Sequence, residues 1–145
     1  MDFTAAAAIS LSGMNVERAR LDASALNLAN MHTTRTPEGG PYKPLSVVSA
    51  YRPSVPFGGF LGSVGNVVPT AQVVAIQQQQ VAPRLVLEPG HPDADAKGFV
   101  AYPAINSVAE MVNVMTAVRS YEANVVALNG AKAMAMKALD IGAGS

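Results

Sequence analysis

The chain has 145 residues, of which 50% are hydrophobic and only 14% are charged, whereas about 25% of residues are charged in ordinary soluble domains. Its ten basic and ten acidic residues cancel, which excludes a strongly basic nucleic-acid-binding surface and favours association over repulsion between copies. The absence of cysteine excludes disulfides, thiolate zinc sites and cysteine nucleophiles.

The first predicted element is a helix over Asp2–Met31, a stretch without proline and with a single glycine, Gly13. Steps of three and four separate its main apolar residues, with Arg18 at the one polar position of the seam: Leu11, Met14, Leu21, Ala25 and Leu28. The first half of this helix carries no charge after Asp2, which indicates burial on every side. We expect the apolar run Ala5–Ile9 to belong to the mature helix rather than to a cleaved signal peptide, because no basic residue precedes it.

The middle of the chain, from His32 to Pro103, contains all ten prolines and is therefore not predicted to be helical. Short runs rich in β-branched residues lie between the breaks and predict the strands of a small antiparallel β unit: Leu45–Ser49, Val67–Val68, Gln72–Ile76, Arg84–Leu87 and Gly98–Ala101. The glycine-rich segment Pro53–Asn66 predicts an exposed, mobile loop.

The last predicted element is a helix from about Ile105 to Ile141, again without proline. Its apolar residues follow a heptad seam that only Lys132 interrupts: Met111, Val114, Val118, Tyr121, Val125, Leu128, Ala135 and Leu139. Asn106 or Ser107 can cap the first turn, with Glu110 at the acidic position of a capping box.

These elements predict an α+β fold, with long terminal helices paired as a coiled-coil-like hairpin and a small antiparallel β-rich middle domain. The predicted division is an N-terminal helix at 1–34, the middle domain at 35–103 with a mobile loop at 53–66, and a C-terminal helix at 104–145. Helices of roughly 45 and 55 Å overrun a compact globule of this chain length, about 40 Å across. We therefore expect their bare apolar flanks to pack against other chains. No apolar run approaches the ~20 residues of a membrane span, so we expect no direct membrane insertion.

Signals for catalytic or ligand-binding chemistry are weak. His91, Asp93 and Asp95 could ligate a metal, but the favoured interpretation is a turn whose aspartates accept hydrogen bonds from backbone amides. The glycines of the middle segment form no nucleotide-binding motif, and no nucleophile motif accompanies the histidines. The sequence therefore predicts no enzymatic activity, no cofactor and no metal.

Asn27 and Asn30 stand three residues apart near the end of the first helix. A buried asparagine fixes the register between packed helices, whereas an asparagine at a helix end can cap it. The spacing leaves both roles open for this pair.

Several segments resemble a known family. LDASALNLANMHTT (Leu21–Thr34) resembles the N-terminal signature of bacterial flagellar rod, hook and hook-filament axial proteins. EGGPYK (Glu38–Lys43), EPGHPDADAKGFVAYP (Glu88–Pro103) and the helical segment Ala109–Gly142 are similar to the proximal-rod proteins of the C type. The joint occurrence of these segments makes the resemblance specific, and it covers the chain apart from roughly Ala50–Val67.

The resemblance implies a structural subunit of the proximal rod of the flagellar basal body. It implies that the terminal helices assemble into the axial tube that transmits torque and encloses the export channel, within the periplasmic space. It implies type III export without a cleaved signal peptide. The implied partners are copies of the chain and other rod proteins, including the adaptor between membrane ring and rod, and no nucleic acid. Tyr121, Glu122 and Asn124 match the family's Y-E-A-N signature, and Asn27 and Asn30 its signature asparagines.

The heptad seams and these signatures together predict an assembly interface: Leu21, Asn27, Leu28, Asn30, Val118, Tyr121, Glu122, Asn124, Val125 and Leu128. We expect Glu122 to pair with Arg18 or Arg20 of an adjacent helix, because a lone buried carboxylate is costly; a solvated position is the alternative. In the free chain we expect disordered terminal helices and a folded core near residues 40–103. A soluble helical-hairpin binding module or chaperone with a β insertion is the alternative function, although its helices would need a charged face.

Overall fold

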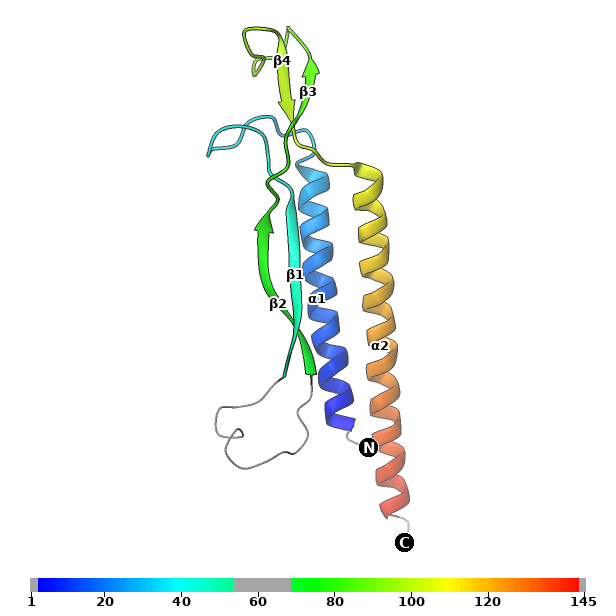
Figure 1. Cartoon of the computed structure of the whole chain (residues 1–145). Helices are drawn as coiled ribbons and strands as arrows, with labels where there is room; N and C mark the ends of the chain where they lie inside the picture. Colours follow the sequence, from blue (N-terminus) through cyan, green and yellow to red (C-terminus); the bar gives the residue numbers. More distant parts are fainter. Residues whose placement is uncertain (1–2, 54–68, 144–145) are drawn as a thin grey trace, which may run out of the picture. The chain divides into compact units, whose positions relative to one another are not determined.

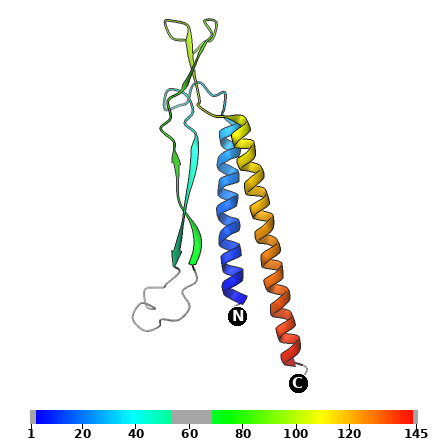
Figure 2. The same ribbon diagram turned by 45° about the vertical axis from the view of Figure 1, so that its right-hand side comes forward.

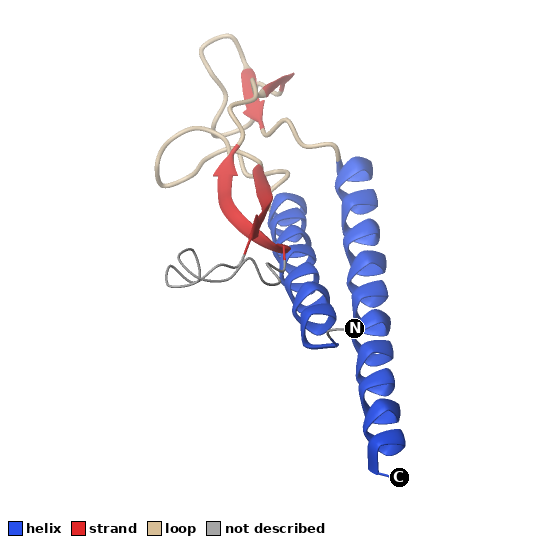
Figure 3. Ribbon diagram, turned by 60° about the horizontal axis from the view of Figure 1, so that its bottom comes forward, coloured by secondary structure: helices blue, strands red, loops and turns tan. Residues whose placement is uncertain are grey.

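The computed structural model describes residues 3–53 and 69–143 (Figure 1). Along them the elements are α1 (Phe3–Ala29), β1 (Leu45–Pro53), β2 (Pro69–Gln78), β3 (Arg84–Leu87), β4 (Phe99–Tyr102) and α2 (Ser107–Ala143). Two terminal helices and a β-rich middle confirm the predicted α+β class, as Figure 3 shows by colour. The strand predicted at Val67–Val68 lies outside the described residues, as does the predicted loop apart from its first residue, Pro53.

Each terminal helix has an asparagine at the end that meets the β region. Asn30 Nδ2 donates at 2.9 Å to the carbonyl oxygen of Leu26, which also accepts from the backbone N–H of Asn30 at 3.0 Å. Asn106 Oδ1 accepts hydrogen bonds from the backbone N–H groups of Val108 at 3.0 Å and Ala109 at 3.2 Å, so Asn106 is the N-cap of α2. α1 has 27 residues and α2 has 37, which correspond to lengths of about 40 and 55 Å.

The four strands form two separate two-stranded sheets, β1–β2 and β3–β4. β3 and β4 are antiparallel, with Leu85 opposite Ala101, Val86 opposite Val100 and Leu87 opposite Phe99. Opposite residues of such a pair stand on the same face. The face of Val86 carries the fully buried Val100, whereas Leu85 and Leu87 on the other face are 63% and 60% exposed.

The turn that joins β3 to β4 depends on a glycine. Gly98 has a φ of +80°, a conformation that favours glycine, and a Cβ there would lie 3.2 Å from Cγ of Pro89. The neighbouring backbone is held by Asp95, whose Oδ1 accepts from the N–H groups of Lys97 and Phe99, both at 2.8 Å. The carboxylate of Asp95 and the conformation of Gly98 therefore close the hairpin.

The chain divides into two compact units, each combining helical and β segments. The first unit contains α1 up to Ala19, β1 from Ser49, β2 up to Val74 and α2 from Ala117. The second unit contains residues 20–48 and 75–116. Figure 2 shows the same elements from a second direction. The division at 1–34, 35–103 and 104–145 stays a prediction.

Few hydrophobic side chains are buried in either unit. Among the described residues they are Met14, Val16, Ala117 and Ala131 in the first unit and Ala23 and Val100 in the second. The start of α2, in contrast, exposes Val108, Met111, Val112 and Met115 by 55–68%. None of the described helices is long and apolar enough to span a lipid bilayer.

Candidate functional site

Asn27 is the centre of a polar cluster in the second unit. Only 2% of Asn27 is exposed, and its Nδ2 donates to the carbonyl oxygen of Leu45 at 3.0 Å and to Oε1 of Glu110 at 3.3 Å. Its Oδ1 accepts from the N–H of Leu45 at 2.8 Å and from the hydroxyl of Tyr42 at 3.2 Å. An amide side chain offers two donors and two acceptor lone pairs, so the side chain of Asn27 uses all of its hydrogen-bonding groups. One side chain of α1 thus fixes the start of β1 and the first turn of α2.

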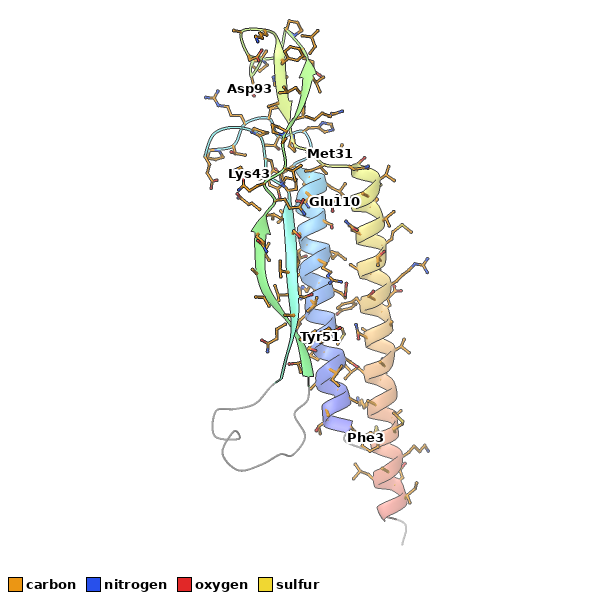
Figure 4. The ribbon with its side chains drawn as sticks, in the orientation of Figure 1. Phe3, Met31, Lys43, Tyr51, Asp93 and Glu110 are labelled. Atoms are coloured by element: carbon orange, nitrogen blue, oxygen red, sulfur yellow. The ribbon has the colours of Figure 1, made fainter. Side chains whose placement is uncertain are left out.

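Glu110 does not close the predicted capping box. Glu110 is labelled in Figure 4. Its Oε1 accepts from Nδ2 of Asn27 of α1 at 3.3 Å, while its backbone N–H donates to the carbonyl oxygen of Asn106 at 3.0 Å. The second oxygen, Oε2, is buried without a hydrogen-bond partner among the described residues. Burial, followed by the charge of Glu110, raises the pKa of Tyr42 above its ordinary value of 10.0. The contact between Glu110 and Asn27 could not be predicted from the sequence, because a glutamate suits both a capping box and a hydrogen bond to another helix.

Asn30 has the second of the two predicted roles, that of a residue at a helix end. Besides its bond to Leu26, its Oδ1 accepts from Oγ1 of Thr33 at 3.2 Å, and its carbonyl oxygen accepts from the N–H of Thr33 at 3.0 Å. Asn30 therefore ends the helix and shapes the turn after it. Of the two signature asparagines, Asn27 sets the packing register and Asn30 caps the helix.

The segment from His91 to Gly98 is the turn that the sequence favoured. His91 Nδ1 accepts from the N–H of Asp93 at 3.1 Å, and the carboxylate of Asp93 accepts from Oγ1 of Thr34 at 2.8 Å and lies 3.7 Å from Nη1 of Arg35. Asp93 therefore ties the hairpin turn to the loop after α1. Across the described ranges, no three His, Asp or Glu side chains gather as a metal site would require.

Tyr102 makes a second connection to the loop after α1. Its hydroxyl donates to Oε2 of Glu88 at 2.9 Å, and the guanidinium of Arg84 lies 5.8 Å from its ring centroid. The rings of His32 and His91 each stand 6.3 Å from the ring of Tyr102, edge to face. Both histidines thus contribute packing around one tyrosine.

Each unit contains one close contact between α1 and α2. In the first unit a Cβ added to Gly13 would lie 2.9 Å from Nδ2 of Asn124, so the backbone of α1 rests directly on that amide. In the second unit Asn27 bonds Glu110. Gly13 was missed as a site residue, although an isolated helical glycine often signals such an approach.

Small and polar residues of α2 are buried beside the predicted seam, of which Val114, Val125, Leu128 and Ala135 are half-buried. Glu110, Ala117, Asn124 and Ala131 are partly or fully buried, each one residue before a predicted seam position. Ala131, next to the predicted break at Lys132, is only 4% exposed. Small and polar residues let the helices approach closely, and a search for large apolar residues selects the neighbouring face.

The predicted interface residues divide by exposure within the single chain. Leu21, Leu28, Asn124, Val125 and Leu128 are half-buried. Val118 and Tyr121 are 36% and 42% exposed, and Glu122 is exposed. Burial of these last three between copies stays a prediction.

The chain is similar to known flagellar proteins. Residues 96–141 match the family described as the C-terminal region of flagellar basal body rod FlgEFG proteins. The flagellar basal-body rod protein FlgC of Escherichia coli O157:H7 is 40% identical over 131 residues, which cover 90% of this chain and 91% of the relative. FlgC of Bacillus subtilis is 38% identical over 92% of this chain and 94% of its own, and FlgC of Borreliella burgdorferi 35% over 92% and 93%.

These relatives are named as rod proteins and not as enzymes, so the buried Asn27 cluster is to be understood as part of a structural protein. The similarity extends along nearly the whole of both sequences and is not confined to one helix. The chain belongs to the FlgC family of flagellar basal-body rod proteins.

Proposed function

We propose that the chain is a structural subunit of the proximal rod, where its terminal helices form part of the axial tube that transmits torque and encloses the export channel. The observation that carries this proposal is the exposure of large apolar side chains along α2 in a family of rod proteins. Met111, Val112 and Met115 are 55–58% exposed in the single chain, and such a surface is characteristic of a site that another protein covers.

The predicted interface residues contribute to this function in two ways. Asn27 and Asn124 contact the opposite helix within the chain and so hold the terminal helices in register for assembly. Val118, Tyr121 and Glu122 are exposed and contact neighbouring subunits. The partners are copies of this chain and other rod proteins, including the adaptor between the membrane ring and the rod. The assembled subunit lies where the rod crosses the periplasmic space, and the flagellar type III apparatus delivers it there.

The test uses a strain that lacks the gene, complemented with an epitope-tagged chain. Basal bodies are purified from both strains, imaged by electron microscopy and probed for the tag. We expect short or absent rods without the chain, and tagged chain in the rod fraction after complementation. Complete rods in the deletion strain, or a chain confined to the soluble fraction as expected for a chaperone, would contradict the proposal.

A further inference from the structure

Each terminal helix has an exposed stripe on the side opposite the contact between α1 and α2. Because each helix is uninterrupted, residues three and four apart stand on one face. The α1 stripe consists of Leu11, Asn15, Arg18, Asp22 and Leu26, and the α2 stripe of Met115, Arg119, Glu122, Val126 and Gly130, all of them exposed. Gly13 and Asn124, which make the contact within the chain, stand about half a turn around their helices from Leu11 and Glu122.

The charges of the two stripes are complementary in one orientation only. Each stripe carries a basic and then an acidic residue along the chain, Arg18 and Asp22 on α1 and Arg119 and Glu122 on α2. A parallel arrangement sets like charges opposite each other. An antiparallel arrangement sets Arg18 opposite Glu122 and Asp22 opposite Arg119. Within the described part of its own chain, none of these four side chains has an ion-pair partner.

The same antiparallel register also matches the apolar residues. It sets Leu26 opposite Met115, which are 50% and 58% exposed, and Leu11, 54% exposed, opposite Gly130. A glycine inside a helix lowers the stability of that helix relative to alanine. Apart from the nearby backbone of its own helix, a Cβ on Gly130 would meet nothing within 4 Å among the residues that the structure describes, so packing among these residues does not account for this glycine. Opposite Leu11 of another copy, Gly130 leaves space into which the leucine side chain can pack, as a knob packs into a hole in a coiled coil.

We propose that the α1 stripe of one copy docks antiparallel on the α2 stripe of the next copy, with Arg18–Glu122 and Asp22–Arg119 ion pairs and Leu11 seated over Gly130. The occupant is a second copy because both complementary stripes occur on the same chain. The contact is heterologous, so each copy keeps one stripe free and the contact propagates. The Leu11–Gly130 pair differs in register by four residues, about one helical turn, from the Gly13–Asn124 contact within the first unit. This inference rests on the proposed function and assigns it a subunit surface.

The first test is a charge exchange in cells whose sole copy of the gene is the variant. Arg18→Glu and Glu122→Arg each create a like-charge contact, so we expect each to lose swimming. The double variant R18E/E122R restores the ion pair with exchanged signs, and we expect it to swim. Lys132→Glu is the matched control, an exposed charge on α2 outside the stripe, and it should swim normally. Normal swimming of both single variants, or a double variant no better than the worse single one, overturns the proposal.

The second test identifies the occupant, using the absence of cysteine from the chain. Asn15→Cys and Val126→Cys chains are co-expressed as separate copies, and purified basal bodies are oxidised. The two positions face away from each other within a chain, so a disulfide dimer between the two tagged forms supports the second copy as occupant. Basal bodies that contain both chains without such a dimer, or with a cross-link to another protein instead, overturn it. Absence of the chain from basal bodies contradicts the proposed function instead.

Discussion

Replacing Asn27 by alanine tests whether one buried amide holds the second unit together. The substitution leaves the N–H and carbonyl groups of Leu45 and the carboxylate of Glu110 without their partner. An unsatisfied buried polar group costs about 1–3 kcal/mol, and more when it is charged. Leu45 is only half-buried, so we take the lower end for its two groups. The expected loss is then roughly 3–5 kcal/mol, a large part of the roughly 5–15 kcal/mol of a typical domain.

The assay is urea dissociation of purified basal bodies, in which we expect the terminal helices to be folded. After sedimentation at each urea concentration, the bound chain is quantified by immunoblot. With a slope of about 2 kcal/mol per molar urea, the midpoint should fall by roughly 2 M. Asn30→Ala is the matched control, because it removes the same amide group from the C-terminal end of α1; the hydrogen bond that it loses contributes about 1 kcal/mol, hence a shift near 0.5 M. Equal shifts for the two variants would refute the assignment of Asn27 as the central residue.

Four further predictions concern the helix contact, the seam, pH and order. Gly13→Ala should weaken rod retention, since its Cβ would lie 2.9 Å from Nδ2 of Asn124; a second change, Asn124→Ala, should relieve this, and an undiminished defect would contradict the contact. Val125→Asp should abolish swimming, because an unpaired buried charge costs several kcal/mol, about 3–5; a motile strain would show that Val125 is solvated in the rod. The pKa of Tyr42 is raised from 10.0. The contribution of Tyr42 to the stability of the fold is therefore full below the pKa that Tyr42 has in the unfolded chain, and it is lost as pH rises through the pKa of the folded chain. Tyr42→Phe should flatten the alkaline dissociation profile of basal bodies above about pH 10, and an unchanged profile would exclude Tyr42 as its source. Limited proteolysis should trim both ends of the free chain to a core near residues 40–103 but spare them in the rod, and equal resistance in both states would identify a self-sufficient hairpin.

The helices and most strands could be predicted because their signals are local. Proline confined to the middle of the chain delimits both helices, and the strand at Arg84–Leu87 has the predicted bounds. The cap of α2 was harder to predict, since Asn106 and Ser107 both suit the N-cap, and the structure shows Asn106 in that role.

The small and polar residues of α2 that lie toward α1 could not be predicted, for a physical reason. Hydrophobic periodicity identifies apolar faces but not the partner of each face. In α2 the face toward α1 uses Ala117 and Asn124, which allow close approach, while Met111 and Met115 remain exposed. The contact between Asn27 and Glu110 joins residues 83 positions apart, a distance over which local sequence patterns carry no information.

The amide of Asn27 has a further consequence for the sheet that it touches. By bonding both backbone groups of Leu45, it imitates one residue of an adjacent β-strand. In the first unit, Oγ of Ser12 likewise accepts from the N–H of Ala71 at 3.2 Å, at the start of β2. Unpaired strand edges are templates for aggregation. The polar side chains of α1 therefore occupy backbone groups of the strands that could otherwise pair with another chain. A chain whose first helix is unfolded exposes these backbone groups until that helix folds.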